Sequence, residues 1–370
     1  MLKFDRQLFL NFDWTLLILV LGICAIGVMN IYSTGFSLVS AKHSPLYIKQ
    51  MQWIMIGLLF MIMAFFVDYR VINQYVYVLY GASLLLLIVV AIYGFTTHGS
   101  QRWFAIGGFS FQPSEISKLT LILALARYFN DHRASGGYDL KDLWIPFFIM
   151  ILPFVLIIRQ PDLGTALMHF LIFCVFVLFV GIRLQAILVA SVGALVMMPV
   201  AWHFMRDYQK DRILMFFSPE RDPLGAGYHI IQSMIAVGSG GFLGKGYLKG
   251  TQTQLKFLPE QQTDFVFSVF AEEWGFLGGL ILISMFLILI LWGLKIAMHS
   301  RDYLGTLIAY GITMLLFCGV FINMGMVLGI LPVVGVPLPF LSYGGSAIVV
   351  LMTGIGLLMN ISTRRYILQR

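Results

Sequence analysis

Charged side chains are scarce in this sequence. Asp, Glu, Lys and Arg make up 11% of its 370 residues, whereas 59% are hydrophobic, and the mean hydropathy is +0.89. In soluble domains about a quarter of the residues are charged. This composition therefore excludes a soluble domain and indicates repeated membrane-spanning segments. The first apolar run, 14–32, follows "MLKFDRQLFLNFD" and lacks a small-residue cleavage motif. We therefore interpret it as an uncleaved span and not as a signal peptide.

Cysteine is scarcer still, and several motifs are missing. Cys24, Cys174 and Cys318 all lie inside apolar runs, which predicts packing roles, and no Cys/His spacing suggests zinc. There is no D-x-D motif. A nucleotide-phosphate loop is also excluded, because Gly246 follows Lys245 where such a loop requires Ser or Thr. The sequence therefore offers no nucleotide site and no dedicated metal cage.

The apolar runs predict an all-α polytopic membrane protein, a single domain over 1–370, with about ten transmembrane helices. An even number of spans places both termini on one side. That side then carries twelve Lys and Arg against five in the short connections opposite, so we expect cytoplasmic termini. The predicted spans are 14–32, 51–67, 76–93, 114–130, 143–159, 163–182, 184–204, 265–294, 303–323 and 345–361.

The net charge of +7 has two sources. Cytoplasmic anchoring explains about half of the basic residues. Many of the others lie in a long external loop, 205–264, which cannot meet cytosolic nucleic acid. An anionic head group of a membrane lipid or a lipid-linked phosphate is the more natural partner.

The external segment 97–118 predicts a short strand-like or turn-rich excursion that ends where Pro113 starts a helix. Glu115 would lie in the first turn of that helix, where a carboxylate suits the helix dipole. Lys118 is three residues further on, so the two can pair. A lysine one turn into a span needs such a partner or an anionic ligand.

The long loop 205–264 contains two notable stretches. "YHIIQSMIAV" is amphipathic at helical spacing and too short to span, so we expect it in the outer interface. Behind it, six glycines between 238 and 250 are interleaved with Lys245 and Lys249. This stretch is either a flexible tether or a loop whose backbone amides approach a ligand.

A third segment, 329–344, is apolar but contains Pro332, Pro337 and Pro339. Prolines forbid one continuous helix, and broken backbone at membrane depth needs cover from protein or a water-filled cavity. We therefore predict a re-entrant segment that ends with the Ser342 hydroxyl. Asp162, in "RQPDLGT", either caps the next helix or belongs to the same external site.

Asp264 stands where "FLPEQQTD" meets the apolar run that follows. On a helix starting near Thr263, residues 264, 268, 271 and 275 would share one face that is polar and then small. This geometry predicts a carboxylate facing a cavity, although it could also be an N-terminal helix charge. Partial desolvation would raise its pKa toward that of a general base.

Five stretches together resemble the SEDS family (shape, elongation, division and sporulation): "QRW…QPSEISK", "QPDLGT", "DPLGAGYHIIQSMIAVGSGG", "GTQTQLKFLPEQQTDFVFSVFAEEWG" and "GILPVVGVPLPFLSYGGSA". They run through nearly the whole chain. The length, with no extended N-terminal tail, is more similar to the elongation branch than to the division branch.

The resemblance implies a peptidoglycan glycosyltransferase that uses lipid II and works with a class B penicillin-binding protein and other elongation-complex proteins. The family's essential carboxylate matches Asp264. Its other implicated positions match Trp103, Glu115, Lys118, Asp162, Gln209 and Arg212. We add Lys245, Glu260 and Ser342 as candidate substrate-binding residues.

The implied chemistry needs a base for the acceptor hydroxyl and cations for the departing pyrophosphate. A divalent cation, Mg²⁺ or Mn²⁺, bridging Asp264 and the pyrophosphate is a candidate. Two alternatives remain open: a lipid II flippase, which would need polar groups across the whole membrane, and a non-catalytic scaffold of a cell-wall complex.

Overall fold

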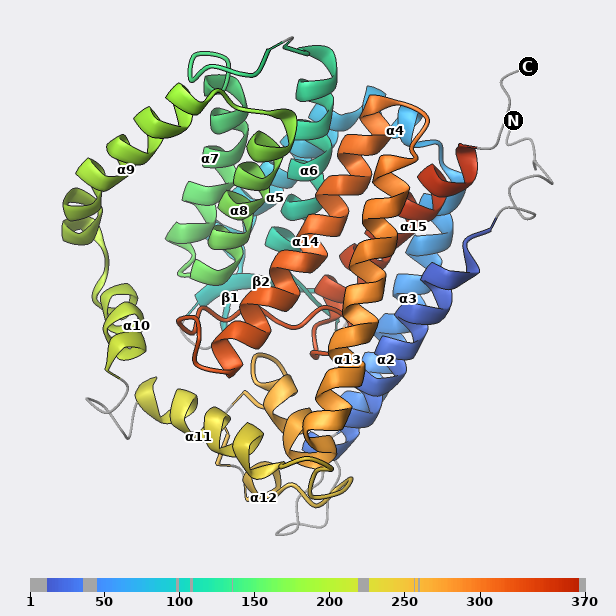
Figure 1. Cartoon of the computed structure of the whole chain (residues 1–370), viewed down its shortest axis with the longest axis vertical. Helices are drawn as coiled ribbons and strands as arrows, with labels where there is room; N and C mark the ends of the chain where they lie inside the picture. Colours follow the sequence, from blue (N-terminus) through green and yellow to red (C-terminus); the bar gives the residue numbers. More distant parts are fainter. Residues whose placement is uncertain are drawn as a thin grey trace.

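The structure of the protein is a computed structural model that describes residues 12–35, 45–97, 100–106, 109–134, 136–218, 226–255, 257–258 and 260–365. Helices dominate it (Figure 1). Their bounds are α2 Trp14–Gly35, α3 Leu46–Phe66, α4 Tyr69–Gln74, α5 Val76–Tyr93, α6 Pro113–Asp131, α7 Trp144–Arg159, α8 Leu163–Val180, α9 Leu184–Phe204, α10 Asp207–Phe217, α11 Ala226–Ser239, α12 Thr251–Gln254, α13 Val266–Met298, α14 Tyr303–Val327 and α15 Gly345–Arg364.

Within the described residues, seven helices are long and apolar enough to cross a membrane: α2, α3, α5, α8, α13, α14 and α15. Two apolar helices are shorter, α7 and the part of α9 from Leu184 to Val200. The remaining predicted span, 114–130, corresponds to α6, whose 19 residues include charged side chains at both ends. A polytopic, mainly helical protein with about ten spans is thus confirmed.

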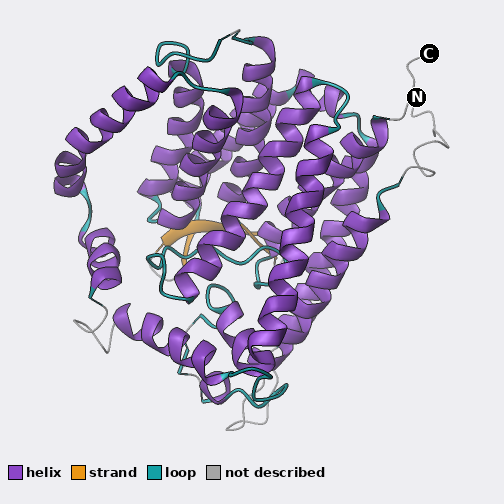
Figure 2. Cartoon of the chain, in the orientation of Figure 1, coloured by secondary structure: helices purple, strands orange, loops and turns teal. Residues whose placement is uncertain are grey.

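A small antiparallel sheet, β1 Phe95–Thr97, β2 Ser100–Ile106 and β3 Phe109–Phe111, lies among the helices (Figure 2). It is the strand-like excursion expected before Pro113. β2 is the central strand and carries Arg102 and Trp103, with Trp103 opposite Phe95. The sheet leads directly into α6, so it brings these two side chains close to the helix that holds Glu115 and Lys118.

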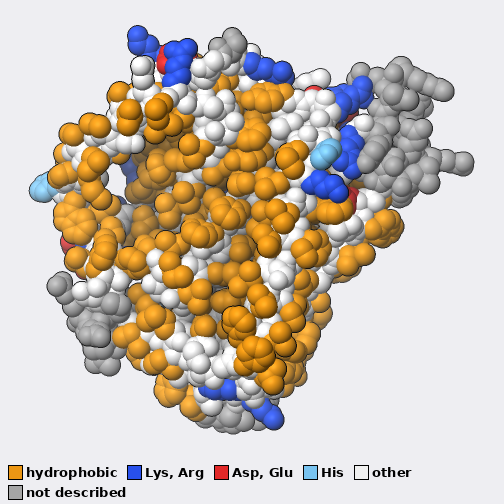
Figure 3. All heavy atoms as spheres, viewed as in Figure 1, with side chains coloured by type: hydrophobic (Ala, Val, Ile, Leu, Met, Phe, Trp, Pro, Cys, Tyr) orange, Lys and Arg blue, Asp and Glu red, His pale blue; other side chains and the backbone are white. Residues whose placement is uncertain are grey.

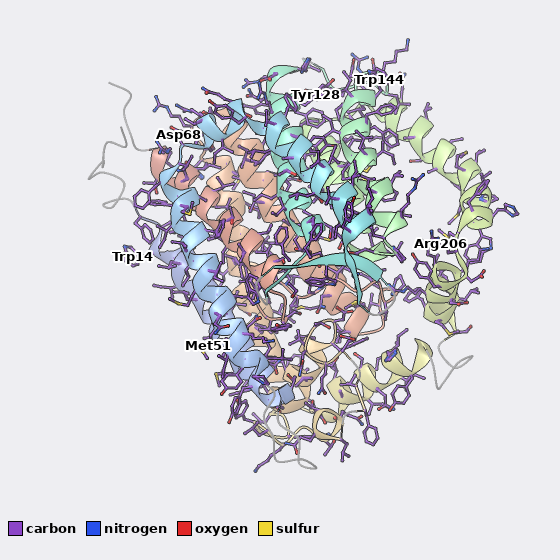
Figure 4. All side chains as sticks on the ribbon, turned by 180° about the vertical axis from the view of Figure 1, so that it is seen from behind. Trp14, Met51, Asp68, Tyr128, Trp144 and Arg206 are labelled. Carbon is purple, nitrogen blue, oxygen red and sulfur yellow. The ribbon has the colours of Figure 1, made fainter. Side chains whose placement is uncertain are left out.

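The helices α14 and α15 form the interior of the bundle, and most of their residues are buried. In contrast, α9 stands apart, and large apolar side chains along it are exposed (Figure 1). Apolar side chains cover the middle of the molecule, while Lys and Arg gather toward its two ends (Figure 3). Asp68, Tyr128 and Trp144 lie at the end where α2 begins and α15 finishes, whereas Arg206 lies on the outlying α9–α10 side (Figure 4).

The prediction of one continuous helix over 265–294 is wrong. α13 is broken at Gly275, which has φ 65° and ψ −162°. The first half lies beside α2. There the Val266 carbonyl accepts a hydrogen bond from Asn30, and the Glu273 carboxylate accepts one from the Ser33 hydroxyl. The second half then runs back to the start of α2, where Trp292 Nε1 donates to Asp13 at 2.9 Å.

A short helical hairpin therefore replaces the straight span. In agreement, a Cβ placed on Gly279 would lie 3.8 Å from the Phe267 ring of the first half. The residues from Val266 to Glu273 are buried, so this first half does not face lipid. Apolar composition alone cannot distinguish a span from a buried half-helix, because both bury hydrophobic side chains.

The long loop is also more ordered than expected, since it contains α10, α11 and α12. α11 is the predicted amphipathic helix. The helix α10 escaped prediction because its first turns, "DYQKDR", are polar and carry no apolar periodicity.

The segment between α14 and α15 is non-helical from about 331 to 338 and passes through the protein interior. Val334, Val336, Leu338, Phe340 and Leu341 in it are buried. Broken backbone here is covered by protein, in keeping with the physical requirement that motivated the prediction.

Candidate functional site

Asp264 lies in a tight turn, 260–265, immediately before α13. The backbone amides of Thr263 and Phe265 donate to the Glu260 carbonyl at 3.1 Å and 3.3 Å. The helix begins at Val266 and breaks at Gly275, so residues 264, 268, 271 and 275 do not share one continuous face as we predicted. Asp264 nevertheless remains partly exposed while its neighbours Phe265 and Val266 are buried.

The turn is clamped to the non-helical segment by two side chains. Asn323 Nδ2, on α14, donates to the carbonyls of both Asp264 and Val336 at 2.8 Å. The Ser342 hydroxyl donates to the Thr263 carbonyl at 2.5 Å and accepts from the Leu338 amide at 2.8 Å. Ser342 therefore links the turn to the non-helical segment inside the protein, and its role as a substrate ligand stays a prediction.

Asn323 was not predicted from the sequence. It is the one amide side chain in a span whose other polar groups are hydroxyls, and this is the signal that could have pointed to it.

Charged groups from three distant parts of the chain surround the Asp264 carboxylate. The pKa of Asp264 is raised to about 6, chiefly by burial and then by the negative charge of Glu260. Arg102 and Arg212 lower this pKa, and Asp162 raises it slightly. A carboxylate with a pKa near 6 is ionised at neutral pH yet binds a proton readily, as a general base requires. Glu260, Asp162 and Arg212 were predicted for this site; Arg102 was missed.

Arg102 reaches the site from β2 and pairs with Asp162, with 3.3 Å between Nη1 and Oδ1. Asp162 also caps α8, because its carboxylate accepts from the backbone and hydroxyl of Thr165 at 3.2 Å and 3.0 Å. Gln112 donates to it as well, at 3.0 Å. Both interpretations of Asp162, as a helix cap and as a member of the external site, are thus compatible with the structure. The "QRW" motif was the available signal for Arg102.

Glu115 and Lys118 form the predicted pair on α6, with 2.8 Å between Lys118 Nζ and Glu115 Oε1. Both are buried. They line a small cavity of about 30 Å³, on the other side of which lie Val336, Pro337 and Ser342 of the non-helical segment. This volume fits about one water molecule. The pair thus lies next to the non-helical segment to which the Asp264 turn is tied.

Two further predicted residues have other roles. Gln209 is buried, and its Oε1 accepts from the Arg206 amide at 3.0 Å, so it caps α10. Lys245 pairs with the buried carboxylate of Glu272 at 2.7 Å, not with a group of the Asp264 site. Their roles as substrate ligands stay predictions. Sequence alone could not reveal these partners, because Glu272 is distant in the chain and Gln209 lay in an unpredicted helix.

The glycine-rich stretch before Lys245 does not form an open cradle either. Lys245 and Gly246 amides donate to the carbonyls of Glu272 and Glu273, each at 3.0 Å, and Phe276 and Leu277 amides donate to Gly241 and Phe242 carbonyls at 2.9 Å and 3.1 Å. The loop therefore satisfies the backbone groups that the break in α13 exposes. Gly244 allows this approach, since a Cβ there would lie 2.1 Å from the Glu273 carbonyl oxygen.

Trp103 is partly buried in β2, and Arg212 is partly buried on α10. His229, on α11, is an unpredicted neighbour: burial lowers its pKa and the nearby Glu260 raises it. Among the described residues, no three His, Cys, Asp or Glu side chains come together as a metal site.

The fold and the site define a multi-pass membrane protein with a carboxylate of raised pKa facing arginines between its helices. The model of the FtsW/RodA/SpoVE family of cell cycle proteins matches residues 13–367. The peptidoglycan glycosyltransferase MrdB of Escherichia coli strain K12 is 43% identical over 363 residues, covering 97% of this chain and 96% of that protein. The chain therefore belongs to the FtsW/RodA/SpoVE family, which confirms the resemblance to the SEDS family.

Two solved structures agree. A chain from a peptidoglycan synthase complex that coordinates polymerization and crosslinking has a TM-score of 0.81 and 34% identity, covering 96% of this chain and 98% of that one. The crystal structure of the rod shape determining protein RodA of Thermus thermophilus has a TM-score of 0.71 and 30% identity, with the same coverage.

Proposed function

We propose that this protein is a peptidoglycan glycosyltransferase that polymerises lipid II into glycan strands during cell elongation. The observation that carries the proposal is Asp264: a partly exposed carboxylate, fixed by its backbone, with a pKa of about 6. The full-length similarity to a protein named peptidoglycan glycosyltransferase supports it.

In the proposed reaction, Asp264 accepts the proton of the acceptor's GlcNAc 4-hydroxyl. The acceptor oxygen then bonds to the anomeric carbon of the donor as the bond from that carbon to the pyrophosphate breaks. Undecaprenyl pyrophosphate leaves with the electron pair, and the configuration inverts in this single displacement. Arg102, Arg212 and Lys118 are the cations that we assign to the pyrophosphate, because arginine forks and a lysine point charge both suit a bulky anion.

A divalent cation would be held by Asp264 and the pyrophosphate oxygens, a donor set that suits Mg²⁺ or Mn²⁺. When bound, it would stabilise the negative charge of the leaving group.

We infer that both termini lie in the cytoplasm of the bacterium and that the Asp264 site opens at the outer face of the cytoplasmic membrane. The excess of Lys and Arg at the end carrying the termini supports this orientation.

The partner we propose is a single-span class B penicillin-binding protein, bound through lipid-facing helix surface and external loops. The similarity to a chain of a complex that couples polymerization and crosslinking supports it. Co-purification of the two proteins, with polymerisation measured with and without the partner, tests this assignment.

The decisive experiment uses purified protein, lipid II and a gel that resolves glycan strands. A general base contributes roughly 10²–10⁴-fold in rate, so Asp264→Asn should lower polymerisation by at least about 100-fold. Because the folded state disfavours the ionised Asp264, the Asn variant should melt at the same or a higher temperature at pH 7. A folded Asn variant that polymerises normally would refute the assignment. Wild-type protein that moves lipid II across vesicles without making strands would indicate the flippase, and protein that does neither would indicate the scaffold.

A further inference from the structure

We propose that Lys245 and Glu272 form a positioning pair that locks the glycine-rich loop into the break of α13 and thereby sets the place of Asp264. The inference rests on the proposed function of Asp264. It assigns a role in the reaction to two residues that do not touch the Asp264 site.

The Glu272 carboxylate is fully buried. Two legs of the loop bind to it, a first leg of residues 241–246 and a second leg of residues 251–253. From the first leg, Lys245 Nζ donates at 2.7 Å. From the second leg, the Thr251 hydroxyl and the Gln252 amide donate at 3.0 Å, and the Thr253 hydroxyl at 3.4 Å. A carboxylate buried so completely requires a cation and hydrogen-bond donors, and this one has both.

The same loop closes the break in the main chain. Backbone hydrogen bonds join its first leg, 241–246, to the residues on either side of Gly275. The charged pair and the backbone bonds act on the same few residues, so losing the pair should loosen the hairpin at its tip.

The break at Gly275 and the Asp264 turn lie at the two ends of the first half of α13. The first half of α13 is a buried helix of about two turns between them, held by Asn30 at Val266 and by Ser233 at Ser268, each at 2.8 Å. A helix of this length transmits a shift at one end to the other, because its backbone bonds resist deformation. Misplacing a catalytic group by about 1 Å can cost about 100-fold in rate.

The pair also has features of a positioning device and not of a substrate site. Lys245 keeps about a quarter of its side chain exposed (26%), while its Nζ is bound by Glu272 and by Thr251 at 2.8 Å. Its ammonium group is held by the Glu272 carboxylate and the Thr251 hydroxyl, as a positioning role requires.

The test compares four variants of the full-length protein in the same detergent: Lys245→Met, Glu272→Gln, the double variant, and Arg364→Met as control. Arg364 pairs with Asp68 at 3.0 Å with similar exposure (23%), at the opposite end of the molecule. Melting temperature, kcat and KM for lipid II are measured for each. Each single variant should lose at least about tenfold in kcat with KM nearly unchanged. The double variant should regain most of this loss, because no unpaired buried charge remains. Arg364→Met should keep the wild-type kcat.

A raised KM in Lys245→Met without recovery in the double variant would overturn the proposal in favour of direct substrate binding. Lower melting temperatures with unchanged kcat in the folded fraction would overturn it in favour of a purely stabilising role. If Asp264→Asn is inactive while these variants are normal, only this inference fails. If Asp264→Asn is active, the proposed function itself fails.

Discussion

Two interruptions of the helical backbone flank Asp264, and they are held in different ways. The break at Gly275 is filled by another stretch of main chain, whose amides and carbonyls satisfy both helix ends. The proline-rich segment is instead tied by side chains, chiefly those of Asn323 and Ser342. Each interruption has a Lys–Glu pair beside it, Lys245–Glu272 in the first case and Lys118–Glu115 in the second. The second pair is buried, whereas in the first only the glutamate is.

The difference has a physical reason. A break made by one glycine leaves complete backbone donors and acceptors at both ends, and neighbouring main chain can pair with them. Prolines remove donors and fix φ, so their segment offers fewer backbone partners and needs longer side chains to hold it. The first arrangement should therefore tolerate no added bulk, whereas the second should tolerate it at a cost in rate.

The largest expected effect comes from substituting the glycines of the two interruptions. In Gly275→Ala, the new Cβ would lie 2.3 Å from the Gly244 amide nitrogen, at a φ of +65°. In Gly335→Ala, φ is +76°, but the nearest atom is Asp264 Oδ2, at 3.3 Å. A non-glycine residue at such a positive φ costs about 1–3 kcal/mol, and only Gly275 adds a backbone clash. We expect Gly275→Ala to lose most folded protein, and Gly335→Ala to fold but turn over slowly.

Melting temperature and polymerisation rate, measured on both variants, test this contrast. Gly193→Ala on α9 is the control, because a Cβ there meets nothing within 4 Å. Equal stability of the Gly275 and Gly335 variants would show that the two interruptions are not held differently.

A smaller effect is expected for the cations near the proline-rich segment and on α10. Lys118→Met and Arg212→Met should each lower turnover or lipid II affinity by at least about tenfold, roughly 1.4 kcal/mol. Of these two variants, only Lys118→Met leaves Glu115 buried without its partner, so its melting temperature should fall. Adding Glu115→Gln to Lys118→Met should restore the stability without restoring the rate.

Melting temperature and rate, measured together in one detergent, separate the two roles. Loss of stability with normal specific activity in the folded fraction would return Lys118 and Arg212 to structural roles.

The smallest effect concerns pH. Asp264 works as a base only when ionised, so kcat should rise with pH through about 6 and then level off. Glu260→Gln removes a negative neighbour that raises the pKa of Asp264, so the rising limb should move to lower pH. Arg102→Met removes an opposing cation and should move it to higher pH. A kcat that does not change between pH 5 and 8 would exclude Asp264 as the titrating base.

The sequence alone determined most of the long apolar helices and where they end, because membrane spans need long apolar runs and charged residues mark their ends. It predicted the strand-like excursion before Pro113, the amphipathic α11 and the proline-rich interruption, since each has a local signature. It also indicated Asp264, Asp162, Glu260 and Arg212, and the Glu115–Lys118 pair at helical spacing.

Tertiary structure alone decided the rest. The break at Gly275 follows two carboxylates, Glu272 and Glu273, inside the predicted span. A glycine there becomes a reversal only where another loop satisfies the exposed backbone. Lys245 and Ser342 have chemistry that suits a substrate, and only their distant partners, Glu272 and Thr263, show how they are used. Arg102 and Asn323 join Asp264 from β2 and α14. Contacts between residues far apart in the chain arise from packing, which local sequence patterns do not encode.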